Sequence, residues 1–461
     1  MLNLLLLVFN MDCYEDKVRK VFNELGRLQM ECPYGSFSEY GLIEPFLLLC
    51  LLKMAVEEDR TGDEAVERVR HELEKNDPEK MTAPDGGGKD SVLRLHKEDM
   101  EKLLGPFATH FRTSLYVFDG IARDYATEYT GMVSMEEINL TSPITSRRYF
   151  ETALRLAYHK RVFSDDKSVN PSIAELARDI LEVKNGESFM DFMCGTCLST
   201  SVIIGDSKNV DIRLVDRDRN CCDYAEFYSR FSGLKPIITC EDSLAKDSSI
   251  AGYKADKIFV TSTIGERVTL YNPKFSIRSE TPASVIKAAD SLKEHGKAVI
   301  VLNSTYAFGT SFEEVRNYIV DNRYVSAVLL LPGLFSRTNL PAVILVLTKE
   351  ENDDILMVDW RDKEKDEKYF YYEKRYMTLV FRPDKEKELV KIIKNRSGEG
   401  SRVVSYDEVK ANGCNLLPSV YVEEKGETKE RSMSQIDDDI YEALRSMEMT
   451  IRALKRGEYR R

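Results

Sequence analysis

The chain has 461 residues, of which 43% are hydrophobic and 31% are charged, and its formal net charge is -12. This composition is typical of a globular protein of two or three domains. The acidic balance excludes a protein that grips nucleic acid by bulk electrostatics, because phosphate binding needs a basic surface. If the chain acts on nucleic acid, a partner is expected to supply most of the contact.

Nine cysteines, an odd number in a long chain, indicate reduced thiols and a cytoplasmic protein. Cys194 and Cys197 form a C-x-x-C pair, whereas Cys221, Cys222 and Cys240 have no such spacing. A zinc site would need a second pair, and a thioredoxin-like redox pair would need an aromatic and proline context. We therefore predict no metal site and expect these thiols to be buried and inert.

The first nine residues, MLNLLLLVF, are apolar but too few to span a bilayer. They lack the basic region and the small-residue cleavage site of a signal peptide, and Met11 offers an alternative start. No other stretch is apolar over the length of a membrane span, so we expect no contact with a membrane.

Residues 1–165 are predicted to form a helical N-terminal domain. Apolar residues recur at helical spacing in Asp16–Leu28, Leu42–Val56 is apolar nearly all round, and Glu57–Lys80 has the pattern of a charged helix. Residues 81–91 contain a proline and three consecutive glycines, which is typical of a flexible loop.

Residues 166–350 alternate short apolar runs with amphipathic stretches, the pattern of an α/β sheet. Asn170 and Pro171 predict the start of a helix over Pro171–Val183, because asparagine caps helices and proline suits their first turn. Seven strands are predicted, at residues 188–190, 211–216, 236–239, 256–260, 298–302, 324–331 and 342–347. The last two are joined directly by Pro332–Pro341, which predicts a Rossmann-like sheet of seven strands with a terminal β-hairpin.

The stretch Glu187–Thr200 organises this predicted sheet. It contains a buried strand that ends in Asp191, then a turn of small residues, then a helix. Strand, tight turn and helix build the nucleotide pocket at the carboxyl edge of a doubly wound sheet. The predicted cofactor-binding residues are the acid at this strand end, three residues of the turn and the acids at two later strand ends, namely Asp191, Cys194, Gly195, Thr196, Asp216 and Asp242.

The spacing of the three acids indicates the kind of ligand. Asp216 follows Gly195 by about 20 residues, which is where an acid meets a ribose hydroxyl. Asp242 would flank a base, and Asp191 would lie near the charged end of the ligand. Three acids suit a nucleoside that carries positive charge, which favours S-adenosylmethionine over a nicotinamide cofactor. The alternative is that acids at strand ends simply face solvent, and a dehydrogenase is disfavoured because the G-x-G-x-x-G fingerprint is missing.

Several segments carry a family resemblance through their order and spacing. DFMCGTC at 191–197 is similar to the pattern D-P-x-C-G-[ST]-G, Asn170-Pro171 takes the place of Thr-Pro, and EDSL at 241–244 is similar to G-D-S-L. GKAVIVLNSTYAF begins the best-matching segment, Lys297–Lys349, and NLLPSVY at 415–421 is similar to N-L-N-P-S-R-Y. From about residue 170 to 422 the chain thus resembles the methyltransferase (M) subunit of type I restriction-modification systems, the adenine-specific N6 DNA methyltransferase family. The resemblance implies a methyltransferase sheet that binds S-adenosylmethionine.

In that family the fourth strand is followed by N-P-P-[FY]. Its asparagine side chain and a proline carbonyl accept hydrogen bonds from the target amino group, and its aromatic ring stacks on the flipped adenine. Two acceptors are needed because the amino lone pair is delocalised into the ring. The corresponding residues here are Thr261-Ser262-Thr263-Ile264, so the degenerate catalytic positions are Thr261, Ser262 and Ile264. Thr261 offers one hydroxyl acceptor, and Ile264 supplies no ring.

The cofactor turn departs from the family pattern as well. Phe192 replaces a proline, and Cys197 replaces a glycine whose missing side chain lets the backbone approach the ligand. Changes at both places predict a pseudoenzyme, an adenine-specific methyltransferase-like subunit whose transferase activity is weak or lost. The alternative is a non-catalytic scaffold protein that uses the methyltransferase fold to assemble with a partner.

Residues 351–430 are predicted as a C-terminal extension and residues 431–461 as a C-terminal helix. Within residues 435–454, apolar residues recur every three or four positions, at Ile436, Ile440, Leu444, Met447 and Ile451. One apolar stripe suits packing on a partner helix. The resemblance implies that this helix engages a DNA-specificity subunit, through which the protein would bind DNA. The alternative is that the helix packs on its own domain.

Overall fold

The computed structural model describes one helix in the N-terminal part of the chain and, with short gaps, the region from 169 to 422. The described residues are 63–75, 169–205, 207–232, 234–262, 268, 275, 277, 279–335, 340–362, 368–373 and 378–422. The helix α3 (Glu64–Lys75) lies within the predicted charged helix Glu57–Lys80. The rest of the predicted helical domain, the loop 81–91 and the helix 435–454 lie outside the described residues. Within the described ranges, no helix is both long enough and apolar enough to cross a membrane.

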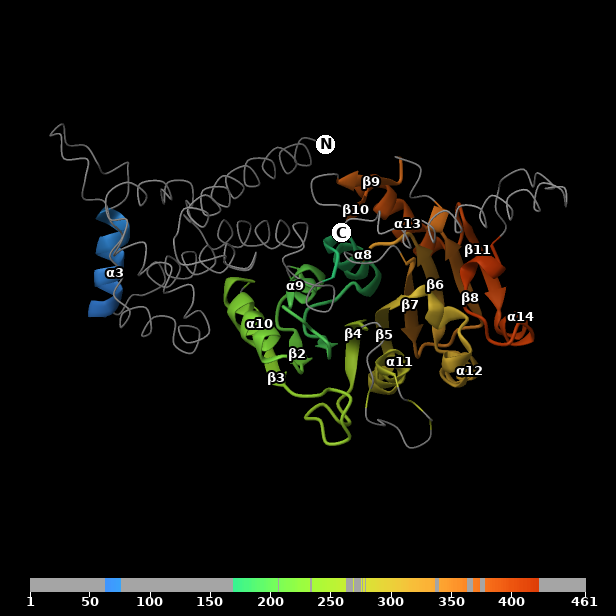
Figure 1. Ribbon diagram of the computed structural model, residues 1–461, viewed down its shortest axis with the longest axis horizontal. Coiled ribbons are helices and arrows are strands. Elements are labelled where there is room, and N and C mark those ends of the chain that lie inside the picture. Colours follow the sequence, from blue (N-terminus) through green and yellow to red (C-terminus); the bar gives the residue numbers. More distant parts are fainter. Residues whose placement is uncertain are drawn as a thin grey trace, which may run out of the picture. The chain divides into compact units, whose positions relative to one another are not determined.

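One large sheet forms the centre of the region from 169 to 422 (Figure 1). Its strands are β1 (Ser188–Asp191), β2 (Asp211–Asp216), β3 (Ile237–Cys240), β4 (Ala255–Thr261), β5 (Leu292–Asn303), β6 (Val325–Leu331), β7 (Ala342–Thr348), β8 (Asp354–Asp359) and β11 (Ser401–Ser405). Their order across the sheet is β11-β8-β6-β7-β5-β4-β1-β2-β3. β7 runs antiparallel to β5 and β6, and β11 runs antiparallel to β8, while the other pairs are parallel. The predicted α/β class and the antiparallel pairing of the strands around 324–347 are confirmed.

The predicted count of seven strands is wrong, because the sheet has nine. β8 and β11 continue the sheet beyond the β6–β7 pair, so this hairpin is not at the edge. β8 has four buried residues between two aspartates, a run too short to distinguish a strand from a helix by periodicity. β11 is mostly exposed, and its pairing with β8 is what defines it. Two further strands, β9 (Phe370–Glu373) and β10 (Thr378–Phe381), form a separate antiparallel pair.

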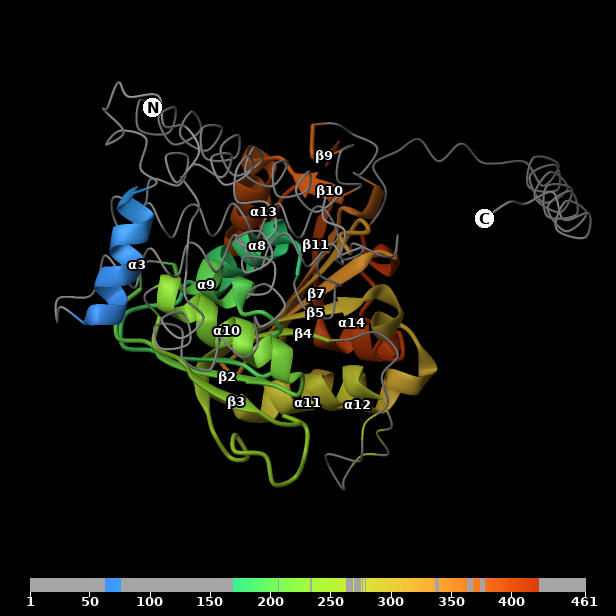
Figure 2. The same cartoon turned by 60° about the vertical axis from the view of Figure 1, so that its left-hand side comes forward.

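Helices cover both faces of the sheet, as the two ribbon views show (Figures 1 and 2). One face carries α8 (Pro171–Leu181), α9 (Leu198–Ile204), α10 (Arg219–Ser232) and α13 (Pro383–Asn395), and the other carries α11 (Glu280–Ser291), α12 (Glu313–Asp321) and α14 (Tyr406–Ala411). Successive strand residues enter opposite cores. In β5, Val299 and Val301 join the first core, whereas Ala298, Ile300 and Leu302 join the second. Burial on both faces explains why the central strands are continuous apolar runs.

The start of α8 is built as the sequence predicts. The Asn170 side chain accepts a hydrogen bond from the Ser172 N–H at 3.0 Å, and Pro171 occupies the first turn. The same side chain donates through Nδ2 to the carbonyls of Leu334, at 3.2 Å, and Leu379, at 3.1 Å. Asn170 is buried, so this single amide connects α8 to the segment after β6 and to β10.

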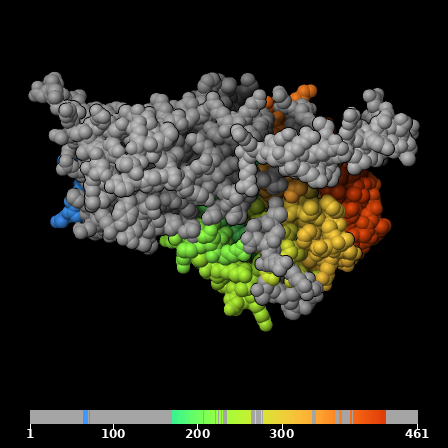
Figure 3. Space-filling model, viewed as in Figure 1, coloured from blue at the N-terminus to red at the C-terminus, as the bar shows by residue number. Residues whose placement is uncertain are grey.

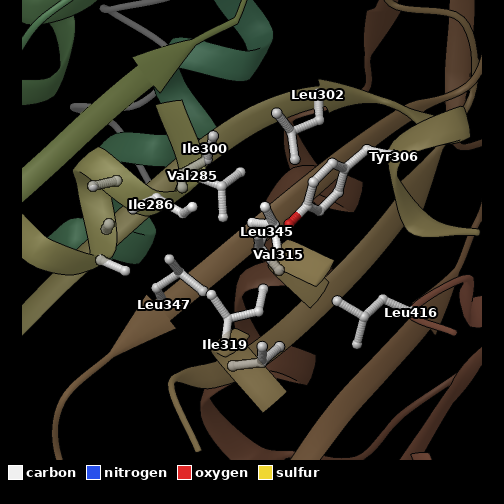
Figure 4. Packing of buried hydrophobic residues seen from close by; sticks show 14 of the residues in the cluster. Val285, Ile286, Ile300, Leu302, Tyr306, Val315, Ile319, Leu345, Leu347 and Leu416 are labelled. Atoms are coloured by element: carbon white, nitrogen blue, oxygen red, sulfur yellow. The ribbon is translucent and has the colours of Figure 1, made fainter. Parts of the chain in front are cut away.

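Tyr306 lies in the core on the α11–α12 face, with its hydroxyl oxygen among Val315 and Leu345 (Figure 4). It is 1% exposed, and its hydroxyl has no hydrogen-bond partner among the described residues. A buried hydroxyl without a partner is unfavourable by roughly 1–3 kcal/mol. Tyr306→Phe should therefore raise the free energy of unfolding by about 1 kcal/mol, measured by urea denaturation.

The matched control for that substitution is Tyr406→Phe. The Tyr406 hydroxyl donates to the Val325 carbonyl at 2.7 Å and accepts from Asn352 Nδ2 at 2.9 Å. Its removal should lower the free energy of unfolding by about 1–2 kcal/mol. Removing the hydroxyl oxygen should thus raise the free energy of unfolding at Tyr306 and lower it at Tyr406. Destabilisation by Tyr306→Phe would mean that its hydroxyl makes a bond in solution.

Candidate functional site

The carboxyl ends of β1, β2 and β4 meet where the sheet reverses its direction of winding. β1 lies between β2 and β4, which is the switch point at which doubly wound sheets bind ligands. The turn after β1 is tied to β2 because the Cys194 N–H donates to the Val215 carbonyl at 3.1 Å. The backbone at Gly195 is left-handed, with φ of 51°. The predicted strand–turn–helix is therefore present at the predicted edge of the sheet.

Asp191 ends β1 and is 1% exposed. One carboxyl oxygen accepts from the Met193 N–H at 3.2 Å, and the other accepts from the Thr200 hydroxyl at 3.4 Å. Burial raises the pKa of Asp191 to about 8, against the lowering effect of the hydrogen bonds from Met193 and Thr200, and the neighbouring Asp216 adds a smaller increase. At neutral pH this carboxyl is mainly protonated, unlike an ordinary aspartate.

Asp216 ends β2 and holds the turn in place. Its Oδ2 accepts from the Gly195 N–H at 2.9 Å, and its Oδ1 accepts from the Asp218 N–H at 2.9 Å. Burial raises the pKa of this carboxyl, and the two backbone donors counteract that effect. Each carboxylate oxygen has two lone pairs, so both can accept one further hydrogen bond.

Asp242 occupies a different environment, because it is exposed. Its Oδ1 accepts from the Leu244 N–H at 2.9 Å, which shapes the turn after β3. The preceding Glu241 donates its N–H to the Asp216 carbonyl at 3.0 Å, so the two acidic segments are adjacent. Asp191, Gly195 and Asp216 are thus brought together at one turn, while Asp242 lies on the neighbouring segment.

Thr196 and Thr261 each have a buried hydroxyl with no hydrogen-bond partner among the described residues. Thr196 lies in the turn after β1, and Thr261 is the last residue of β4. Buried polar atoms left without partners at the ends of strands are the kind that a polar ligand satisfies. The donor set and the two hydroxyls fit a nucleoside ligand at this edge. Within the described residues, no group of three His, Cys, Asp or Glu side chains could hold a metal ion.

Ser262 follows β4, and its side chain is already engaged. Its hydroxyl is 3.1 Å from the Thr281 hydroxyl of α11, and its N–H donates to the Val301 carbonyl at 3.2 Å. Ser262 is buried. Ile264, the third degenerate catalytic position, lies outside the described residues. Of the predicted catalytic positions, Thr261 alone presents a described hydroxyl without a partner.

Cys197, at the end of the turn, has left-handed backbone, with φ of 65°, although it is not glycine. Its thiol is fully buried and lies near Thr200 of α9 and Ser229 of α10. Burial raises the pKa of this thiol to about 12. The side chain therefore contributes to the core beneath α9 and α10.

Two substitutions at Cys197 separate the effect of backbone strain on stability from the effect of losing the buried thiol. Cys197→Gly removes the thiol and relieves the strained backbone, whereas Cys197→Ala removes the thiol and keeps the strain. The glycine variant should be more stable than the alanine variant by about 1 kcal/mol in urea denaturation. An alanine variant at least as stable as the glycine variant would show that the turn adopts another backbone conformation in solution.

Sequence reasoning missed two connections around this site. Arg217, directly after β2, forms an ion pair of 3.9 Å with the buried Glu280 at the start of α11. The Cys222 thiol lies 3.3 Å from the Asp216 carbonyl. An acid at a helix start and a cysteine pair are visible in the sequence. Arg217 and Glu280 are far apart in the chain, while Cys222 meets Asp216 because α10 packs on β2, and no sequence signal pairs either set.

Comparison with known proteins gives matches both to a family model and to a curated relative. Residues 271–430, about a third of the chain, match the family model described as N-6 DNA Methylase. The chain is 28% identical over 168 residues to the type I restriction enzyme MpnII methylase subunit of Mycoplasma pneumoniae. That match covers 35% of this chain and 30% of the relative's length.

Two solved structures share the fold. A type I restriction-modification system methyltransferase subunit from Streptococcus thermophilus has a TM-score of 0.65 and 14% identity, covering 89% of this chain and all of its own. A chain from a structural study of complex assembly and conformational transition of the type I R-M system has a TM-score of 0.60 and 14% identity, covering 95% and 99%. The predicted resemblance is confirmed: the chain carries an N-6 DNA Methylase region and has the fold of the methyltransferase (M) subunits of type I restriction-modification systems.

Proposed function

We propose that the chain is the adenine-specific N6 methyltransferase-like subunit of a restriction-modification system. It keeps a pocket for S-adenosylmethionine, while its ability to transfer the methyl group is weak or lost. The observation that carries the proposal is the hydrogen bond from the Gly195 N–H to Asp216 at 2.9 Å. It joins the first turn to the acid of the second strand at the switch point, where this fold binds a nucleoside.

The residues of this chain have distinct roles in the proposed pocket. Asp216 accepts hydrogen bonds from the ribose hydroxyls, and Asp242 lies toward the base. Asp191 lies toward the charged end of the ligand, with the Thr196 hydroxyl and the backbone of Cys194 and Gly195 lining the turn. When bound, S-adenosylmethionine supplies an electrophilic methyl group on a sulfonium sulfur.

The weakness of transfer follows from the end of β4. The target amino group needs two acceptors, and Thr261 offers a single hydroxyl without a partner. The Ser262 hydroxyl bonds Thr281 of α11 instead. The N-6 DNA Methylase match begins at residue 271, after both the cofactor turn and this position. The missing second acceptor and the late start of the match both support the proposal that this chain has diverged from the family at the residues that contact the target amino group.

Calorimetric titration of the full chain with S-adenosylmethionine tests the pocket. We expect binding in the micromolar range, weakened at least tenfold by Asp216→Ala and unchanged by Asp247→Ala, which replaces an exposed acid outside the pocket. Absence of binding at millimolar ligand would reject the pocket in the isolated chain. A methyl-transfer assay on adenine-containing DNA should give little or no product.

Restoring the N-P-P-[FY] motif of the family tests whether its replacement is what weakens methyl transfer. The combined change Thr261→Asn, Ser262→Pro and Ile264→Phe supplies the missing acceptor geometry and the ring. Methylation gained by this variant would show that the rest of the site works. If the variant binds S-adenosylmethionine and remains silent, the non-catalytic scaffold becomes the better account.

The proposed partners are DNA and a specificity subunit in the cytoplasm. The solved chains with this fold are a methyltransferase subunit of a type I restriction-modification system and a chain from a study of complex assembly in such a system. The net charge of -12 supports DNA contact through a partner. The apolar stripe of residues 435–454 is the proposed contact. Replacing Leu444 and Met447 by glutamate should abolish co-purification with a specificity subunit without changing cofactor binding.

A further inference from the structure

Two thiols, those of Cys222 and Cys240, lie beside the carboxyl end of β2. Cys222 lies in the first turn of α10, and Cys240 is the last residue of β3. Cys240 is the register partner of Asp216 in the β2–β3 pair. This places both cysteines near the edge strand β3, at the end of the sheet opposite β11. The space-filling view shows these two ends in green and red (Figure 3).

The contacts of the two sulfurs converge on the same backbone. Cys222 Sγ is 3.3 Å from the Asp216 carbonyl and 3.8 Å from the Thr239 carbonyl. Cys240 Sγ is 3.8 Å from the Arg217 carbonyl. The thiols thus contact the consecutive carbonyls of Asp216 and Arg217 at the end of β2, and the Cys222 thiol also contacts the Thr239 carbonyl, in the residue before Cys240. The Cys240 thiol is close enough to the Cys222 thiol to raise its pKa.

The two thiols differ in access. Cys222 is 4% exposed, whereas Cys240 is partly exposed. Burial, and then the proximity of Cys240, raises the pKa of the Cys222 thiol above its usual range. An external oxidant therefore meets Cys240 first. A buried thiol next to an accessible one is the arrangement of a resolving and an attacked cysteine.

We propose that Cys222 and Cys240 are an oxidative modification site that forms a disulfide on exposure to a peroxide. Cys240 loses its thiol proton and takes one oxygen from hydrogen peroxide, giving a sulfenic acid and one water. The Cys222 sulfur then attacks the Cys240 sulfur and displaces the hydroxyl group. That group leaves as a second water with the Cys222 thiol proton. Two thiols are oxidised by two electrons, and one peroxide is reduced to two waters.

The disulfide changes the backbone that positions Asp216. It removes the S–H donors from the Asp216 and Arg217 carbonyls and joins α10 to β3 covalently. If the chain binds S-adenosylmethionine as proposed above, oxidation should weaken that binding, because Asp216 holds the turn through Gly195. This consequence rests on the proposed function, whereas formation of the disulfide does not.

The test is peroxide treatment of the reduced full-length chain, followed by thiol alkylation and mass spectrometry under non-reducing conditions. We expect the oxidised protein to carry two fewer alkyl groups than the reduced protein, and dithiothreitol before alkylation should restore both. Trypsin cuts after Arg219, Arg230 and Lys246, so Cys222 and Cys240 fall in different peptides. The cross-linked product should join peptides 220–230 and 231–246.

Single cysteine-to-serine variants show which two cysteines form the disulfide. Cys222→Ser and Cys240→Ser should each lose the cross-link. Cys221→Ser, which removes the other cysteine of peptide 220–230, should retain it. The proposal is overturned if Cys240 is oxidised further while Cys222 stays open to alkylation, or if the cross-link survives Cys222→Ser. Calorimetry with S-adenosylmethionine on the oxidised and reduced chain is a separate readout, so failure of the pocket would leave the mass result intact.

Discussion

Replacing Asp191 by asparagine should raise the free energy of unfolding, on the order of 4 kcal/mol at pH 7. The side chain is buried at the end of β1, and burial raises its pKa to about 8. The unfolded chain releases this proton near pH 4, while the folded chain keeps it until about pH 8. The folded state thus binds more protons over this range, and the free energy of unfolding of the unmodified protein falls as pH rises. Asparagine keeps an acceptor for the Met193 N–H and never ionises.

The pH dependence is the decisive feature of this comparison. Below about pH 4 both proteins carry a neutral side chain at position 191, so their stabilities should be similar. The difference should grow between pH 4 and 8 and level off above pH 8. Urea denaturation at several pH values measures it, with Asp247→Asn, an exposed acid, as the control. A difference that stays constant with pH would mean that Asp191 is ionised in the folded protein.

Replacing Arg316 by leucine should lower the free energy of unfolding by about 3–5 kcal/mol. Its guanidinium is buried and donates to four carbonyls. The Nε donates to Cys414 at 3.0 Å, and the terminal nitrogens donate to Tyr306 at 3.0 Å, Gly309 at 2.6 Å and Phe308 at 3.4 Å. Leucine fills part of the space but leaves these carbonyls without their donor. Lysine, with its compact ammonium, should recover part of the loss.

The exposed Arg323 is the matched control for Arg316. It forms an ion pair with Asp353 at 2.8 Å, and both side chains are more than half exposed. Arg323→Leu should change the free energy of unfolding by less than about 1 kcal/mol. Guanidinium chloride denaturation measures both variants. Equal effects at the two arginines would show that the carbonyl contacts of Arg316 contribute little.

Arg316 also explains how two of the resembling segments meet. Its donors join the segment after β5, which ends GKAVIVLNSTYAF, to Cys414, which precedes NLLPSVY. The Leu416 N–H donates to the Ala307 carbonyl at 2.9 Å across the same junction. The described region from β5 to residue 422 is therefore one packed unit, and it falls within the N-6 DNA Methylase match.

The sequence by itself determined the elements whose signals are local. Continuous apolar runs marked the strands from β1 to β7, and the direct succession of β6 and β7 marked their antiparallel pairing. Asn170 and Pro171 marked the start of α8, because a helix cap acts within three residues. The turn after β1 was also visible, since strand, small residues and helix follow one another.

Only the tertiary structure decided the features that depend on partners distant in the chain. β8 and β11 are strands because the sheet edge pairs with them, not because their short sequences favour it. The burial that makes Asp191 mainly protonated and the contact of Ser262 with Thr281 come from packing around the strand ends. The proximity of Cys222 and Cys240 also comes from packing. The partial exposure of Cys240 corrects the expectation that every thiol is buried. Composition and spacing specify which groups a strand end carries, whereas solvent access and neighbours fix their protonation and bonding.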